Sequence, residues 1–166
     1  MCRRCYSSDE AQVHMTQNLD KTNFLNVDLD IHSKTDLRPL VDAMGDWVLV
    51  LFAGRVKRHY EAHLELAGSQ LPKISHSSSP EWLIRKLCKL VQELPAEARN
   101  LWDAAKLRSF NIGIQGPARD TYYWSAIGSE AIRATAELDA GIGITVYGPM
   151  RVVGRPRRKK PASRAD

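Results

Sequence analysis

Two segments in which apolar and polar side chains alternate strictly constrain the fold of this chain more than any other feature. Residues 23–33 and residues 58–67 both follow this pattern. Their apolar positions are Leu25, Val27, Leu29 and Ile31 in the first segment and Tyr60, Ala62, Leu64 and Leu66 in the second. Successive side chains of a strand point to opposite faces, so each segment is predicted to be a strand that is buried on one side only.

Apolar spacing and turn residues predict the remaining elements. Helical spacing indicates a helix at 35–44, a second at 80–106 with a kink at Pro95, and a third at 129–139. The apolar run 47–53 is typical of a central strand, and residues 110–114, 122–127 and 141–147 are predicted as further strands.

These elements predict an α+β fold with a six-stranded, mixed but mainly antiparallel sheet, helices on one face, and a part that is ferredoxin-like. The second face of the sheet is expected to be at least partly in contact with water. The predicted core consists of Leu25, Val27, Leu29, Leu37, Leu40, Val50, Leu64, Leu87, Leu90, Leu101, Ile112, Ile114, Leu138, Ile144 and Val146.

Composition divides the chain into a disordered leader at 1–21, a single domain at 22–150 and a disordered basic tail at 151–166. The sequence shows no apolar run near the roughly 20 residues that span a membrane and no secretory signal.

The three cysteines are typical of a cytoplasmic protein, in which thiols stay reduced. Cys2 and Cys5 form a CxxC without a second pair or a strand–helix context, so we interpret them as non-functional.

The polar faces of the two alternating strands hold the residues most suited to binding. They are Asp28, Asp30 and His32 in the first strand and His59, Glu61 and His63 in the second. Three interpretations stay open: a solvated sheet face with weak cross-strand pairs, a protein-binding surface, and a metal or acid–base site, since His and carboxylates are common metal ligands.

The favoured functional hypothesis is a non-enzymatic module that binds a protein partner through this face. Tyr122, Tyr123 and Trp124 are consecutive, so at least one is expected to reach the same face, and exposed aromatics are typical of interfaces. The chain has no HExxH, no GxSxG elbow and no glycine-rich phosphate loop, and no cofactor is predicted. The alternative is a metal-dependent enzyme that uses the Asp/His/Glu cluster.

Two short motifs resemble a known family. The stretch Phe110-Asn-Ile-Gly-Ile114 and the stretch Leu138-Asp-Ala-Gly-Ile-Gly-Ile-Thr-Val-Tyr147 resemble the C-terminal half of a bacterial domain-of-unknown-function family of the DUF4279 type. The resemblance covers residues 23–148 and implies a bacterial, cytosolic α+β protein. It supplies no catalytic residues. Some small bacterial α+β domains act as immunity proteins, which is an analogy only.

The basic tail carries the net charge of the chain. Residues 151–166 contain seven Lys or Arg and one Asp, and so contribute +6 to a formal net charge of +5, which leaves −1 for the other residues. The tail is interpreted as a solubilising segment, with a nucleic-acid contact or a nuclear-localisation patch as alternatives.

We therefore expect truncation after Met150 to remove nearly all retention of the protein on a cation exchanger at neutral pH, because the remaining chain is close to neutral. The measurement is the salt concentration at elution. Strong retention of the truncated chain would instead reveal a basic patch on the domain.

Overall fold

The computed structural model describes residues 22–71, 79–116 and 122–148, which form a five-stranded sheet and four α-helices. The leader 1–21, the tail 151–166 and the pair Cys2 and Cys5 lie outside the described residues. In chain order the elements are β1 (Asn23–Ser33), α1 (Arg38–Met44), the 3₁₀ turn η2 (Gly45–Trp47), β2 (Val48–Val56), β3 (His59–Leu66), the 3₁₀ turn η3 (Gly68–Gln70), α2 (Pro80–Gln92), α3 (Ala96–Asp103), β4 (Leu107–Gln115), α4 (Ser129–Glu137) and β5 (Gly141–Tyr147).

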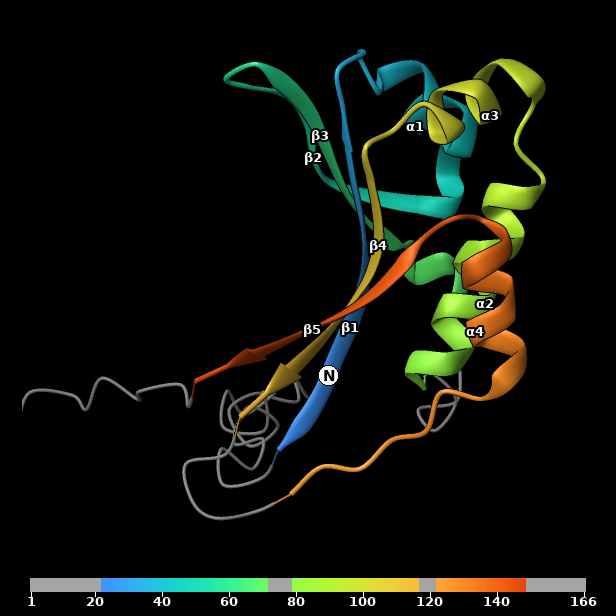
Figure 1. Cartoon of the computed structure of the whole chain (residues 1–166). Helices are drawn as coiled ribbons and strands as arrows, with labels where there is room; N and C mark the ends of the chain where they lie inside the picture. The colour runs from blue at the N-terminus through green and yellow to red at the C-terminus, as the bar shows by residue number, and fades with distance from the viewer. Residues whose placement is uncertain (1–21, 72–78, 117–121, 149–166) are drawn as a thin grey trace, which may run out of the picture.

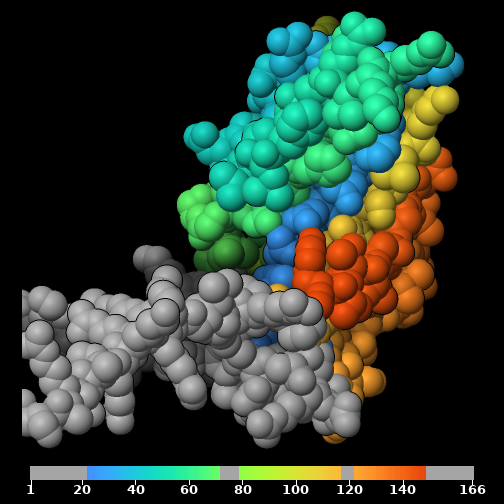
Figure 2. Space-filling model, turned by 90° about the vertical axis from the view of Figure 1, so that its left-hand side faces the viewer, coloured from blue at the N-terminus to red at the C-terminus, as the bar shows by residue number. Residues whose placement is uncertain are grey.

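The sheet has the order β2-β3-β1-β4-β5, with antiparallel pairing throughout except between β4 and β5, which are parallel. All four α-helices lie on one side of the sheet (Figure 1). Figure 2 shows the opposite side, where the five strands follow one another without a covering helix. The predicted class is therefore confirmed: a mixed, mainly antiparallel sheet with helices on one face. We call the uncovered side the open face.

The core forms between the helices and the centre of the sheet. On β1, Val27, Leu29 and Ile31 are at most 2% exposed, and they alternate with the polar residues of the open face. On the helical side, Trp102 is fully buried and its indole Nε1 donates to the carbonyl oxygen of Leu138 at 3.0 Å. This bond satisfies the one polar group of a large apolar side chain and ties the end of α3 to the end of α4.

Capping and proline residues set the boundaries of the helices α2 and α3. Ser79 caps α2 by accepting a hydrogen bond from the backbone N–H of Trp82 at 3.2 Å, and Pro80 occupies the first helical position. The expected kinked helix at 80–106 is two helices, because Pro95 stands between them as the residue before α3. In the part of the chain that the structure describes, no helix is both long and apolar enough to cross a membrane.

Two predictions about strands are wrong. The predicted sixth strand at 122–127 is irregular, and the run 47–53, predicted as a central strand, belongs mainly to the edge strand β2. Strand β4 already pairs with β1 on one side and with β5 on the other. A further strand after β4 therefore has no place beside it, and the chain runs irregularly to α4 instead.

Four predicted core residues are exposed. Val50 is 45%, Ile144 66% and Val146 64% exposed, and all three belong to the edge strands β2 and β5. The fourth is Leu25, which is 48% exposed at an irregularity in the pairing of β1 with β4. The helices cover the centre of the sheet, so apolar residues on the outer strands β2 and β5 meet solvent.

We expect Leu29→Ala to lower the free energy of unfolding by about 2–5 kcal/mol, because it leaves a cavity in a fully buried site. The matched control is Leu25→Ala in the same strand, which removes the same atoms from an exposed position and is expected to cost less than about 1 kcal/mol. Urea denaturation of both variants measures the difference. Equal losses would show that the assignment of the two faces of β1 is wrong.

Candidate metal centre on the open sheet face

The antiparallel pairing of β1 with β3 brings the predicted polar residues together. His32 lies opposite Glu61, and Asp30 lies opposite His63. Directly opposed residues of an antiparallel pair have Cβ atoms about 4.5–5.5 Å apart, which is within reach of long polar side chains. The apolar residues that alternate with these polar residues are fully buried on the helical side, and this fixes the polar residues on the open face. The buried residues are Leu29, Ile31, Ala62 and Leu64.

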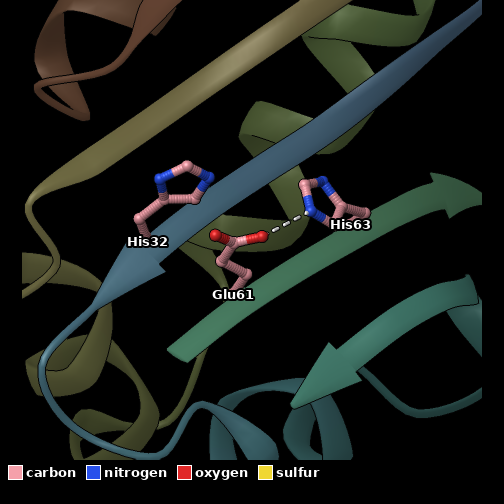
Figure 3. A group of neighbouring side chains, drawn as sticks. All are labelled: His32, Glu61 and His63. Carbon is pink, nitrogen blue, oxygen red and sulfur yellow. Dashed lines mark hydrogen bonds and ion pairs between the residues drawn. The ribbon is translucent and has the colours of Figure 1, made fainter. Parts of the chain in front are cut away.

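His32, Glu61 and His63 form a compact group of possible metal ligands. Each offers one ligand atom, and the three atoms lie within 4.8 Å of one another. The Glu61 carboxylate lies between the two imidazole rings, and a dashed line joins it to His63 (Figure 3). The distance from Glu61 Oε2 to His63 Nε2 is 3.3 Å. We call these three residues the ligand cluster.

Two neighbours orient the ligand cluster. Asp30 Oδ1 lies 2.7 Å from His63 Nδ1, and Glu61 Oε1 lies 2.5 Å from His59 Nε2. Both ring nitrogens of His63 face carboxylate oxygens, so with Nδ1 donating to Asp30 the ring can also donate from Nε2 to Glu61 only when it is protonated. A metal ion bound at Nε2 would take the place of that proton while Nδ1 still donates to Asp30. A carboxylate that holds the far nitrogen of a ligand histidine is the usual outer support of protein metal sites.

The same contacts shift the protonation of the cluster. Partial burial acts to lower the pKa of His63, but hydrogen bonds to Asp30 and Glu61 outweigh it and the pKa is raised on balance. The pKa of Glu61 is lowered, chiefly by its hydrogen bond to His59, against a smaller effect of burial. Glu61 is therefore held as a carboxylate, which is the form that binds a metal ion.

A second carboxylate pair lies further along the same two strands. Asp28 is directly opposite Glu65, and Asn26 donates a hydrogen bond from Nδ2 to each of them. Burial and then the negative charge of Glu65 raise the pKa of Asp28 to about 6. Like charges directly opposite each other destabilise a sheet, so this part of the open face carries an unfavourable charge near neutral pH.

The predicted aromatic residues do not join this group. Tyr123 lines a hollow with Ile112 and Ile144, which belong to the side of the sheet that carries the helices, while Tyr122 and Trp124 are 89% and 78% exposed in the irregular segment before α4. The aromatic neighbour of the ligand cluster is Phe52 instead, with its ring centroid 5.9 Å from that of His63. Sequence reasoning missed Phe52 because the apolar run 47–53 was interpreted as a central strand, and a continuous apolar run does not show which of its residues reach the open face.

Comparisons with known proteins add no family to this geometry. The chain matches no family model, no curated protein and no solved structure. The positions and contacts of the side chains are therefore the basis for a functional interpretation.

We expect Asp28→Asn to raise the melting temperature at pH 8 by about 2–4 °C, which corresponds to roughly 1 kcal/mol for a chain of this size once solvent screening is allowed for. The pKa of Asp28 is higher in the folded protein than its ordinary 3.8. Its contribution to stability is therefore most favourable below about pH 4 and is lost as the pH rises through about 6.

The gain from Asp28→Asn is accordingly expected to shrink toward zero below the ordinary pKa of 3.8, at about pH 3, where Asp28 is mostly protonated in both states. Thermal unfolding followed by circular dichroism from about pH 3 to pH 8 measures this dependence. Asp42→Asn, at an exposed position of α1, serves as the control and should show no such trend. A gain that does not change with pH would contradict the assigned repulsion.

Proposed function

We propose that the protein binds a Zn²⁺ ion on its open face and acts there as a metal-dependent hydrolytic enzyme. The single observation that carries this proposal is the convergence of His32, Glu61 and His63, whose ligand atoms lie within 4.8 Å of one another. Cross-strand pairs of His with a carboxylate are common on solvated sheets. A third ligand that reaches the same point is what separates this cluster from an ordinary pair.

The type and number of ligands favour zinc. Two imidazoles and one carboxylate make up the ligand set of several catalytic zinc sites, which leave a fourth position for water or substrate. At bond lengths of about 2.0–2.2 Å, tetrahedral ligands lie roughly 3.3–3.6 Å apart. The 3.3 Å between Glu61 Oε2 and His63 Nε2 matches this spacing, and the ligand atom of His32 lies within 4.8 Å of both.

An open coordination position gives such an ion a chemical use. A Zn²⁺-bound water has a pKa near 7 in well-formed sites, and so supplies hydroxide at neutral pH. In ester hydrolysis the hydroxide oxygen bonds to the electrophilic atom and the bond to the leaving oxygen breaks. The leaving oxygen then takes up the proton that the water released. The open face leaves this position accessible to substrate, whereas structural zinc sites are closed by a fourth protein ligand.

We further propose that the elements from β1 to β4 form a ferredoxin-like unit. The chain order β-α-β-β-α-α-β differs from the six-element unit by one additional helix, and β3 inserted between β1 and β2 and β1 inserted between β3 and β4 support this interpretation. The resemblance to the DUF4279-type family stays a proposal of the same kind. Neither assignment carries a function, because one fold hosts many activities.

A second candidate function is recognition of a protein partner through the same face. It is favoured by two exposed apolar side chains of β2 that lie on the open face, Leu49 opposite Glu65 and Phe52 opposite His63. An apolar centre beside charged groups is typical of interfaces. In an affinity capture experiment, Leu49→Ser/Phe52→Ser should lose any specific partner and still bind Zn²⁺. Recovery of the same proteins by this variant and by the wild type would remove this candidate.

The metal proposal predicts that Zn²⁺ at about 100 times its dissociation constant adds about 2.7 kcal/mol to the free energy of unfolding. Isothermal titration calorimetry of the metal-free protein should give one ion per chain. Glu61→Gln removes a ligand charge and should weaken Zn²⁺ binding by more than about 100-fold, beyond the roughly 10–100-fold typical of an outer-shell change such as Asp30→Asn.

The matched control is Glu65→Gln, which makes the same chemical change four residues along β3 and outside the ligand cluster. It should leave the affinity for Zn²⁺ within a few-fold of the wild type. Loss of affinity in both variants to the same degree would point to nonspecific attraction of the ion by the acidic face. Absence of stoichiometric Zn²⁺ binding by the wild-type protein would end the proposal.

A further inference from the structure

A hollow of about 400 Å³ adjoins the ligand cluster at the end of the sheet where β1 ends and β3 and β4 begin. It is lined by His32, Ser33, Lys34, Arg58, His59, Lys106 and Leu107. Its size falls within the range of about 300–1,000 Å³ that is usual for small-molecule sites. His32 belongs to both, and His59, which also lines the hollow, contacts Glu61, so the hollow adjoins the ligand cluster.

Three permanent cations line this hollow, and they come from three different loops. Lys34 follows β1, Arg58 belongs to the turn between β2 and β3, and Lys106 precedes β4. The backbone N–H of Lys106 donates to the carbonyl oxygen of His32 at 2.8 Å, which fixes this loop against the end of β1. The fold thus gathers side chains that are far apart in the sequence.

Within the described residues, these three cations have no acidic partner. Among the described residues, no carboxylate lies within 4.0 Å of the charged groups of Lys34, Arg58 or Lys106, whereas Arg38, Arg99 and Arg108 are each paired with an acid. The described residues that line the hollow include no Asp or Glu. A concave surface with several uncompensated positive charges attracts anions and raises their local concentration.

We propose that the hollow binds the phosphate group of a small phosphate monoester, which places the ester next to the metal ion; this assignment of a substrate class rests on the proposed function. A phosphate group carries up to two negative charges and three acceptor oxygens. The planar guanidinium of Arg58 suits bidentate contact with it, and lysine supplies further positive charge. A single carboxylate would leave most of the positive charge unmatched.

The rest of the open face favours a small ligand over a nucleic acid strand. Beyond the hollow, β1 and β3 present Asp28, Asp30, Glu61 and Glu65 on the same face. A polyanionic backbone that extended from the hollow along the sheet would meet this line of carboxylates. The cations are confined to the end of the sheet, so the ligand is expected to place one phosphate there.

The experiment measures two dissociation constants for the same full-length proteins, one for Zn²⁺ and one for inorganic phosphate. Hydrolysis of p-nitrophenyl phosphate is measured separately as the ester-cleaving activity. Arg58→Gln/Lys106→Gln should weaken phosphate binding at least 10-fold and leave Zn²⁺ binding within twofold. The matched control, Arg55→Gln/Lys89→Gln, removes the same two charges away from the hollow and should change phosphate binding less than twofold. The Zn²⁺-loaded wild type should release p-nitrophenol faster than the metal-free protein.

The outcomes separate the two proposals. Zn²⁺ binding without phosphate binding, or phosphate binding that is equal in the two double variants, overturns the phosphate site and leaves the metal centre intact. Phosphate binding that depends on Arg58 and Lys106 in a protein that takes up no Zn²⁺ supports the hollow and overturns the metal centre. A thymidine oligonucleotide that binds more than 10-fold more tightly than phosphate, and depends on the same two residues, would overturn the choice of a small ligand.

Discussion

The central position of β1 is the constraint on which both the fold and the site depend. This strand pairs antiparallel with β3 on one side and β4 on the other. A shift of one residue in either register would send Val27, Leu29 and Ile31 to the open face and bury the polar set instead. Burial of three large apolar side chains therefore also determines that Asp30 and His32 point outward beside β3.

Alternation predicted β1 and β3 correctly, because each strand has one face under the helices and one in water. The apolar residues of segments 47–53 and 141–147 led to wrong predictions for Val50, Ile144 and Val146, since an apolar strand pattern does not report whether a helix covers the face. Coverage depends on the sheet order, which local sequence does not encode. The predicted strand at 122–127 failed for a related reason, because the sheet has no free position next to β4.

The three candidate ligands were among the six residues that the sequence placed on polar strand faces, but their geometry was not predicted. Alternation put His32 on the polar side of β1, and it put Glu61 and His63 on the polar side of β3. That His32 stands opposite Glu61 follows from the register of β1 with β3, which depends on long-range pairing. Lys34, Arg58 and Lys106 left no periodic signal at all. They lie in turns and at strand ends, and the meeting of three loops at one end of the sheet brings them together.

The charges of the open face are arranged in a way that folding alone does not favour. Four carboxylates share the polar faces of β1 and β3, and the pKa of Asp28 is raised first by burial and then by the negative charge of Glu65 opposite it. Meanwhile Lys34, Arg58 and Lys106, which would neutralise them, are held apart at the end of the sheet. A sequence selected for stability alone would interleave these charges. Local conflicts of this kind are expected at functional sites.

A divalent cation beside the carboxylates and an anion among the lysine and arginine side chains would relieve both parts of the conflict at once. The two proposed ligands therefore have one physical origin, the separation of charge along a single face.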